Sequence, residues 1–255
     1  MLEYPRFDLQ GQVVLVTGAS KGIGYDLACA LAHAGAQVVV GARNLASLTE
    51  LVHRIKDEGG DARAVSLDMR DLDQIHNAVE QTIHFFGRID ILVNNAGIGY
   101  NHDAVDVTEE DWDEMMDVNL KGLFFMCQAA GKHMIAQHYG RIVNMSSQAG
   151  QVGIVRHAVY CATKGGVDQL TRVLALEWAK HNITVNAVAP TFIRTPGTAE
   201  RLDTPAFAAD VLSRLPLGRV GDTMDVAGAV IYLASPAADL VTGTVLLVDG
   251  GWTAQ

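Results

Sequence analysis

Several residue types are scarce in this sequence, and each shortage excludes a class of protein. Only 6 of the 255 residues are proline, 3 are cysteine, and charged residues make up 19%. This composition excludes a collagen-like chain, a disulfide scaffold and a disordered segment. No apolar run reaches the roughly 20 residues that cross a bilayer, and the opening residues, MLEYPRFDLQ, have no signal-peptide pattern. We therefore expect a cytoplasmic globular protein with no membrane partner.

The small number of cysteines and the shortage of positive charge exclude further kinds of site and partner. Cys29, Cys127 and Cys161 are odd in number and lack the spacing of metal ligands, so they are interpreted as reduced thiols and no metal site is predicted. The 19 Lys and Arg are outnumbered by 29 Asp and Glu, for a formal net charge of −10. Such a chain repels nucleic acid, which is therefore not an expected partner.

Apolar residues are plentiful, at 49%, and alternate between strand-like and helix-like spacing. Short apolar runs predict seven strands, at 12–17, 37–40, 62–67, 90–93, 141–145, 183–188 and 244–248. Helical spacing predicts helices at 23–34, 46–58, 72–86, 108–138, 158–180 and 225–233. Strands this apolar are buried on both faces, as in parallel sheets. The prediction is an α/β, doubly wound, Rossmann-type fold, with a seven-stranded parallel sheet flanked by helices on both faces.

No linker or repeat divides the chain, so residues 1–255 are predicted to form one domain. Residues 191–219 fit no strand or helix pattern and are rich in Pro and Thr. Long loops inside compact domains are usually functional. We therefore predict a substrate lid at about 191–219, with a variable surface insertion as the alternative.

A glycine-rich turn follows the first predicted strand. Gly18, Gly22 and Gly24 have the spacing G-x-x-x-G-x-G, between a strand and a helix. Glycines there permit a tight turn and a close approach of pyrophosphate to the amide-rich helix start. The context favours binding of a dinucleotide over a plain helix start.

Further motifs occur in a fixed order along nearly the whole chain. After T-G-x-x-x-G-I-G come the sequences N-N-A-G at 94–97, V-N-L around Asn119, Y-x-x-x-K at 160–164, I-T-V-N-A-V-A-P at 183–190 and V-D-G-G at 248–251. This series resembles the short-chain dehydrogenase/reductase family. The resemblance implies cofactor contacts from Gly18, Ser20, Lys21, Gly22, Ile23, Gly24, Arg43, Asp68, Met69, Asn95, Ala96, Gly97, Tyr160, Lys164, Pro190, Ile193 and Thr195.

The end of the second predicted strand indicates which dinucleotide is bound. An NAD site usually has an acid there that accepts from the ribose 2′-hydroxyl, and this chain has Ala42 followed by Arg43. Arg43 and Lys21 offer positive charge for a 2′-phosphate. The prediction is NADP(H), with NAD(H) as the alternative. Asp68 resembles the family's adenine contact, although capping of the following helix is also possible.

Tyr160 and Lys164 stand at i and i+4, hence on one face of a helix. The Lys164 ammonium would lower the pKa of Tyr160 from about 10 toward the range of an acid/base catalyst. By resemblance, Ser147 holds the substrate oxygen and Asn119 orders a water for proton relay. Ser146 is the rival of Ser147, but the family's spacing selects Ser147. The predicted catalytic residues are therefore Asn119, Ser147, Tyr160 and Lys164.

The sequence P-T-F-I-R-T at 190–195 resembles the family's nicotinamide-binding P-G-x-x-x-T, and Thr191 replaces its glycine. That replacement puts the local backbone path in doubt. Substrate contacts are predicted for a mixed set of side chains, namely Ser147, Gln148, Ile154, His157, Tyr160 and Phe192, with Tyr100 a further candidate. His157 could equally be a surface or capping residue.

The predicted reaction interconverts a small ketone and a secondary alcohol, such as a sugar, sugar acid, polyol or cyclic ketone. A 3-oxoacyl thioester on an acyl carrier protein is the alternative. The family's carrier-docking arginines are replaced by His138 and Leu176, which with the net negative charge disfavours an acidic carrier. A non-catalytic dinucleotide sensor is a third possibility, against which the complete Asn-Ser-Tyr-Lys set argues.

Apolar arcs in the helices at 108–138 and 158–180, together with the resemblance, predict a homotetramer.

Overall fold

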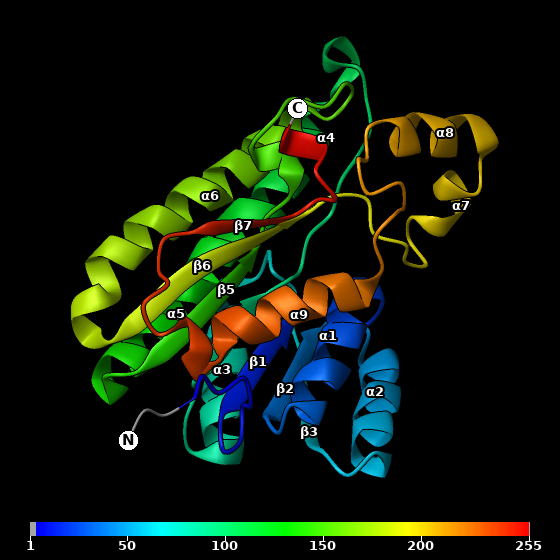
Figure 1. Ribbon diagram of the computed structural model, residues 1–255. Helices are drawn as coiled ribbons and strands as arrows, with labels where there is room; N and C mark the ends of the chain where they lie inside the picture. Colours follow the sequence, from blue (N-terminus) through cyan, green and yellow to red (C-terminus); the bar gives the residue numbers. More distant parts are fainter. Residues whose placement is uncertain (1–3, 255) are drawn as a thin grey trace.

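One parallel sheet runs through the molecule (Figure 1), and it has seven strands. The computed structural model describes residues 4–254. In the sheet the strands follow the order β3-β2-β1-β4-β5-β6-β7, with bounds β1 Val13–Thr17, β2 Gln37–Ala42, β3 Asp61–Ser66, β4 Ile91–Asn94, β5 Gly140–Met145, β6 Ile183–Pro190 and β7 Val245–Val248. Every strand pair is parallel. The predicted doubly wound Rossmann-type fold is confirmed.

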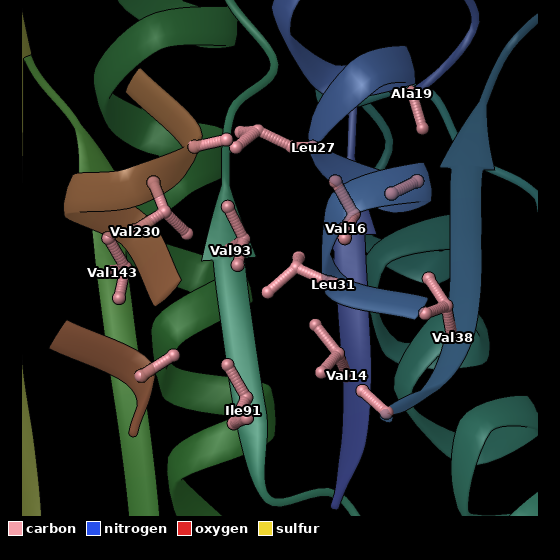
Figure 2. Close-up of a cluster of buried hydrophobic side chains, with 14 of the residues drawn as sticks. Val14, Val16, Ala19, Leu27, Leu31, Val38, Ile91, Val93, Val143 and Val230 are labelled. Carbon is pink, nitrogen blue, oxygen red and sulfur yellow. The ribbon is translucent and has the colours of Figure 1, made fainter. Parts of the chain in front are cut away.

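Helices cover both faces of this sheet. One face carries α1 (Gly22–His33), α2 (Leu45–Asp57) and α9 (Thr223–Ala234), and the other carries α3 (Leu72–Phe86), α5 (Gly122–Gln137) and α6 (Ala158–Trp178). The alternation of β1 explains the two layers, because Val14 and Val16 enter the first core and Leu15 enters the second. Figure 2 shows Val14 and Val16 packed toward Leu27 and Leu31 of α1.

The order of the strands fixes where a ligand can bind. β1 pairs with β2 on one side and with β4 on the other, so the direction of winding reverses between β1 and β4. In open parallel sheets, ligands bind outside the carboxyl ends of the strands at this point. The glycine turn follows β1 and the N-N-A-G motif follows β4, which places both at that edge.

The predicted helix at 108–138 is interrupted. It consists of α4 (Glu109–Met116) and α5, joined by a π-helical turn, Asp117–Lys121, that contains Asn119. A π turn inserts one residue into the helix, and such turns are frequent at functional sites. Thr108 begins the helix as its N-cap, in a capping box with Asp111.

Residues 191–219 are not the structureless loop that the sequence predicts. They contain two short helices, α7 (Ala199–Leu202) and α8 (Pro205–Ser213), as Figure 1 shows to one side of the sheet. Leu202, Val211 and Leu215 form a small apolar cluster there, with Phe192 and Trp252 packed against it. Burial of these side chains supplies the stability that short helices lack on their own. Among residues 4–254, no helix has the length and hydropathy needed to span a membrane.

Candidate active site

The glycine turn has the geometry of a phosphate-binding site. Gly18 and Gly22 have positive φ angles, 68° and 61°, which favour glycine. At Gly24 a Cβ would lie 2.4 Å from the Asn95 amide nitrogen, so no side chain fits there. Helix α1 begins at Gly22, and its N-cap, Lys21, makes no side-chain cap hydrogen bond. The helix amides therefore stay available to an anion, as a dinucleotide pyrophosphate requires.

The N-N-A-G motif is hydrogen-bonded to the end of β1 and the glycine turn. The Asn95 side-chain amide donates to the carbonyls of Thr17, at 3.0 Å, and Gly18, at 3.2 Å. The Thr17 hydroxyl accepts from the backbone N–H groups of Asn95 and Ala96, each at 3.0 Å. These bonds hold the ends of β1 and β4 together, so the predicted cofactor residues on both loops lie at one edge.

The end of β2 faces the same turn. The backbone N–H groups of Gly18 and Ala19 donate to the Gly41 carbonyl, at 2.8 and 3.3 Å. Arg43 and Lys21 are exposed, and within residues 4–254 neither forms an ion pair. Two uncommitted cations at this edge suit a ribose 2′-phosphate.

Asp68 lies at the end of β3 with Met69, but it does not cap the next helix. The Asp68 carboxylate pairs with Arg70 at 2.7 Å, and this contact lowers the pKa of Asp68. Helix α3 is capped by Asp71 instead, whose carboxylate accepts from the N–H groups of Asp73 and Gln74. The capping alternative for Asp68 was therefore wrong, because the residue adjacent to the helix occupies that position.

The three predicted reactive side chains meet at the end of β5 and the start of α6. The hydroxyls of Ser147 and Tyr160 are hydrogen-bonded to each other. The Lys164 ammonium donates to the Met145 carbonyl at 2.7 Å and lies 5.6 Å from the centre of the Tyr160 ring. The Ser146 hydroxyl instead donates to the Lys164 carbonyl at 3.5 Å. Spacing therefore selected the serine that lies beside the tyrosine.

The expected lowering of the pKa of Tyr160 is absent. Burial of the phenol raises the pKa of Tyr160 above its usual 10, and the hydrogen bond to Ser147 opposes the rise only in part. Lys164 does not reverse this because its ammonium points at the Met145 carbonyl. Burial also lowers the pKa of Lys164 to about 8, against the attraction of Asp168. Tyr160 and Lys164 are neighbours because they lie on one face of the helix, but desolvation determines the protonation state of each.

Asn119 is fully buried, and its side chain extends from the π turn to the loop after β4. Its side chain accepts from the Ile98 N–H and donates to the Ile98 carbonyl, both at 2.8 Å. It also donates to the Thr163 hydroxyl at 3.3 Å, next to Lys164 in the chain. A Cβ on Gly97 would lie within 3.7 Å of both the Asn119 amide oxygen and the Lys164 nitrogen. Asn119 is therefore a neighbour of the lysine, and its role in ordering a water stays a prediction.

Asp168 is a further buried carboxylate on the catalytic helix that motif spacing did not single out. It lies one turn beyond Lys164, and its charge raises the pKa of that lysine. Asp168 accepts from the side-chain amide of Gln151. The i+4 spacing of Asp168 from Lys164 is visible in the sequence and places both residues on one face of the helix.

A cavity of about 490 Å³ opens over this group. Of the predicted cofactor and substrate residues, those that line it are Ile23, Asn95, Gly97, Ser147, Gln148, Ile154, His157, Tyr160, Lys164, Pro190, Phe192, Ile193 and Thr195. Tyr100 does not line it, because its hydroxyl donates to Glu114 and its ring stacks on His102. His157 lines the cavity with its ring 6.2 Å from that of Tyr160.

Two polar atoms in the cavity wall lack partners. The Gln148 amide oxygen and the Thr191 hydroxyl are buried and form no hydrogen bond with any described residue. Buried polar groups are usually satisfied, so unpaired ones in a cavity suit a ligand that supplies hydroxyl groups. Thr191 has no positive φ angle, and its N–H donates to the Val248 carbonyl at 3.2 Å. The backbone path therefore tolerates threonine where the family has glycine.

A lysine-to-methionine change at position 164 is expected to stabilise the protein while abolishing activity. Because the pKa of Lys164 falls from 10.5 to about 8 on burial, the charged form costs about 3 kcal/mol of folding free energy below pH 8. Allowing for the lost bond to Met145, Lys164→Met is expected to raise the free energy of unfolding at pH 7 by about 2 kcal/mol.

The buried charge also predicts how the stability difference between wild type and the variant changes with pH. Between pH 8 and 10.5 the unfolded wild-type chain binds more protons than the folded one, so wild-type stability rises with pH and the difference from the variant shrinks. Thermal unfolding of both proteins between pH 6 and 10 measures this, with the exposed Lys132→Met as control. A constant difference across that range would contradict the buried-charge explanation.

The fold and this set of side chains define a Rossmann-type oxidoreductase. The profile of the family described as "Enoyl-(Acyl carrier protein) reductase" matches residues 18–253. The 2-dehydro-3-deoxy-D-gluconate 5-dehydrogenase of Escherichia coli (strain K12) is 42% identical, over 98% of both chains. The 3-oxoacyl-(acyl-carrier-protein) reductase of Thermotoga maritima is 44% identical, over 95% of this chain and 98% of its own.

Solved structures agree. A gluconate 5-dehydrogenase from Burkholderia cenocepacia J2315, in complex with NADP and tartrate, superposes with a TM-score of 0.95 at 39% identity and 98% coverage of each chain. The chain belongs to the short-chain dehydrogenase/reductase family.

Proposed function

We propose that this protein is an NADP(H)-dependent oxidoreductase that interconverts a ketone and a secondary alcohol of a sugar acid or polyol. The observation that carries the proposal is a single cavity lined by Ser147, Tyr160 and Lys164 together with the unpaired Gln148 oxygen and Thr191 hydroxyl. The first three supply the acid/base chemistry, and the last two suit a substrate rich in hydroxyl groups.

The cofactor site is formed by the glycine turn, the end of β2 and the residues after β6. The turn and the start of α1 would hold the pyrophosphate, while Lys21 and Arg43 would hold the 2′-phosphate. Thr195 lies next to the turn, since a Cβ on Gly22 would be 3.5 Å from it, and is proposed to hold the nicotinamide end. A bound nicotinamide dinucleotide supplies or accepts the hydride.

The protein's own residues handle the proton. In the direction of reduction, the phenol of Tyr160 must be protonated in order to donate to the developing alkoxide, and its raised pKa keeps it so. Ser147, bonded to Tyr160, would donate to the same oxygen. In the direction of oxidation Tyr160 would accept the proton of the alcohol. Lys164, 5.6 Å from the ring centre, is the proposed cation for the tyrosinate once its ammonium leaves the Met145 carbonyl. Asn119 beside it is proposed to hold a water that carries the proton away.

Three observations bear on the substrate. A structural neighbour at 39% identity is described as a gluconate 5-dehydrogenase in complex with NADP and tartrate, and tartrate is a hydroxylated carboxylate. A 3-oxoacyl carrier reductase stays the second candidate, because one relative with that name is 44% identical. Against it, Leu176 is exposed and His138 ends a helix at the positions where the family's carrier-docking arginines stand. We therefore favour the small hydroxylated substrate.

The test is a panel of substrates, in which ketones are assayed with NADPH and NADH and alcohols with NADP+ and NAD+. We expect reduction of 5-keto-D-gluconate, or oxidation of 2-dehydro-3-deoxy-D-gluconate or of a polyol such as D-threitol, with a lower KM for the phosphorylated cofactor. A 3-oxoacyl thioester serves as the competing substrate. If only the thioester is reduced, the carrier reaction is correct, and if no substrate is turned over while cofactor still binds, the protein is a sensor.

A cytoplasmic homotetramer also remains part of the proposal. Val173 and Leu176 are exposed on α6 and Leu247 is exposed on β7, the strand at one edge of the sheet. These apolar side chains are supporting observations for two contacts between copies, one across the helices and one at the C-terminal strand. Sedimentation of the purified protein should show a tetramer, and a stable monomer at micromolar concentration would refute it.

A further inference from the structure

Arg201 differs from the other arginines of segment 191–219. Within residues 4–254 its guanidinium forms no ion pair, whereas each of the other three has a carboxylate partner, in the pairs Arg194–Asp203 at 2.8 Å, Arg214–Asp210 at 3.0 Å and Arg219–Asp225 at 2.6 Å. Arg201 is also the only one of the four that lines the catalytic cavity. It is therefore a cation without a carboxylate partner at the wall of the cavity where substrate is proposed to bind.

The guanidinium of Arg201 is held in a defined orientation. It lies 4.5 Å above the centre of the Phe207 ring, and Phe207 packs edge-on against Phe192, which lines the cavity, at 5.6 Å. Stacking occupies the flat face of the guanidinium and leaves the N–H groups along its edge free. Leu202, the next residue, is buried in the cluster beneath. A guanidinium held in this orientation can form two parallel hydrogen bonds with a planar carboxylate.

The remaining charges of the cavity agree with an anionic ligand. Although the chain has 29 Asp and Glu, none of the described ones lines this cavity. Lys164 is committed to the Met145 carbonyl, and the His157 Nδ1 atom is bonded to the Val155 carbonyl. A carboxylate entering the cavity therefore meets one available cation, Arg201, and no opposing charge.

We propose that Arg201 binds the carboxylate of a sugar-acid substrate and so makes the site select acids over neutral polyols. This inference rests on the proposed function and narrows its substrate class. The hydroxyls between the two ends of the substrate would meet the unpaired Gln148 oxygen and Thr191 hydroxyl. The ketone would lie at Tyr160, on the same cavity wall. Segment 191–219 thereby supplies specificity, while the sheet supplies the chemistry.

The cofactor's phosphates are another anion that an arginine could hold. Thr195 and Thr198 also line the cavity, and Thr195 lies against the glycine turn. The two anions are separated by comparing a charged and an uncharged substrate with one cofactor. Contact with a carboxylate changes only the kinetics of the acid, whereas contact with a phosphate changes the cofactor's KM with either substrate.

The experiment compares Arg201→Gln with wild type on 5-keto-D-gluconate and on the neutral ketose L-sorbose, both with NADPH. We expect the KM for the acid to rise about 30-fold in the variant, as for loss of a charge-assisted contact, and the KM for L-sorbose to change less than twofold. Arg201→Lys keeps the charge and is expected to recover part of the loss. Arg194→Gln removes the same charge from the same segment outside the cavity and should leave the acid's KM unchanged.

Different failures have different meanings. Equal losses on both substrates would make Arg201 a structural residue and overturn the inference while the proposed function stands. A raised KM for NADPH with both substrates would assign Arg201 to the cofactor and also overturn it. Absence of turnover by the wild-type protein on both compounds and on the wider panel would instead refute the proposed function.

Discussion

The Tyr160→Phe variant is expected to lose about 1,000-fold in kcat for ketone reduction, the typical effect of removing a positioned general acid. The change removes one hydroxyl and leaves the ring, which lines the cavity from the first turn of α6. Phenylalanine therefore keeps the packing and loses both the proton and the hydrogen bond to Ser147. Steady-state kinetics with NADPH and an active ketone measures the effect.

Its control is a second tyrosine beside the cavity. Tyr100→Phe also removes one hydroxyl, but that hydroxyl donates to Glu114 and does not reach the cavity. We expect kcat within about twofold of wild type for this variant, and unchanged NADPH binding for both. Tyr160→Phe with near-normal turnover would assign the acid/base role to another group and refute the catalytic set.

Ala42→Asp is expected to reverse the cofactor preference. Ala42 ends β2 with 7% of its surface exposed, in register with Ser66 of β3 and directly before the exposed Arg43. A carboxylate at this point would repel the 2′-phosphate of NADPH and accept from the 2′-hydroxyl of NADH. We expect kcat/KM for NADPH to fall about 100-fold, since like charges in contact cost several kcal/mol. The value for NADH should be maintained or raised.

The Ala42→Asn variant is the control that distinguishes an effect of charge from an effect of side-chain size. It adds nearly the same volume without the negative charge, so we expect a loss with NADPH of about fivefold or less. Kinetics with both cofactors on one substrate measures all three proteins. A wild-type protein that already prefers NADH would show that Lys21 and Arg43 do not bind phosphate, and an equal loss in the Asp and Asn variants would show that bulk alone is responsible.

Much of the fold and of the site could be predicted because the signals are local. Apolar runs buried on both faces, such as 13–17, predict strands of a parallel sheet, and all seven predicted strands are present. The glycine turn and the Tyr160–Lys164 pair were placed correctly because fixed spacings on a strand end or a helix determine which side chains are neighbours. The structure brings Ser147 and Asn119 to the same place.

The failures share a different cause, since each depends on contacts between distant parts of the chain. Helices α7 and α8 are short and form because Leu202 and Val211 pack on Phe192 and Trp252. The direction of the pKa shift of Tyr160 depends on how deeply the loops bury it. Arg201 could not be singled out because only the fold shows that it lines the cavity and that its neighbours in segment 191–219 are already paired.

The small apolar cluster under α7 and α8 has a consequence for how such enzymes diversify. Its buried members, Leu202, Val211 and Leu215, belong to neither of the two cores that stabilise the sheet. Helices α7 and α8 therefore pack on a cluster of their own, whereas Ile193, at the start of the segment, belongs to the first core. Substitutions in these two helices are expected to change which alcohol is accepted with little effect on the two cores. A lineage could acquire new carbon sources in this way, and an engineer could graft the segment between relatives as a cassette.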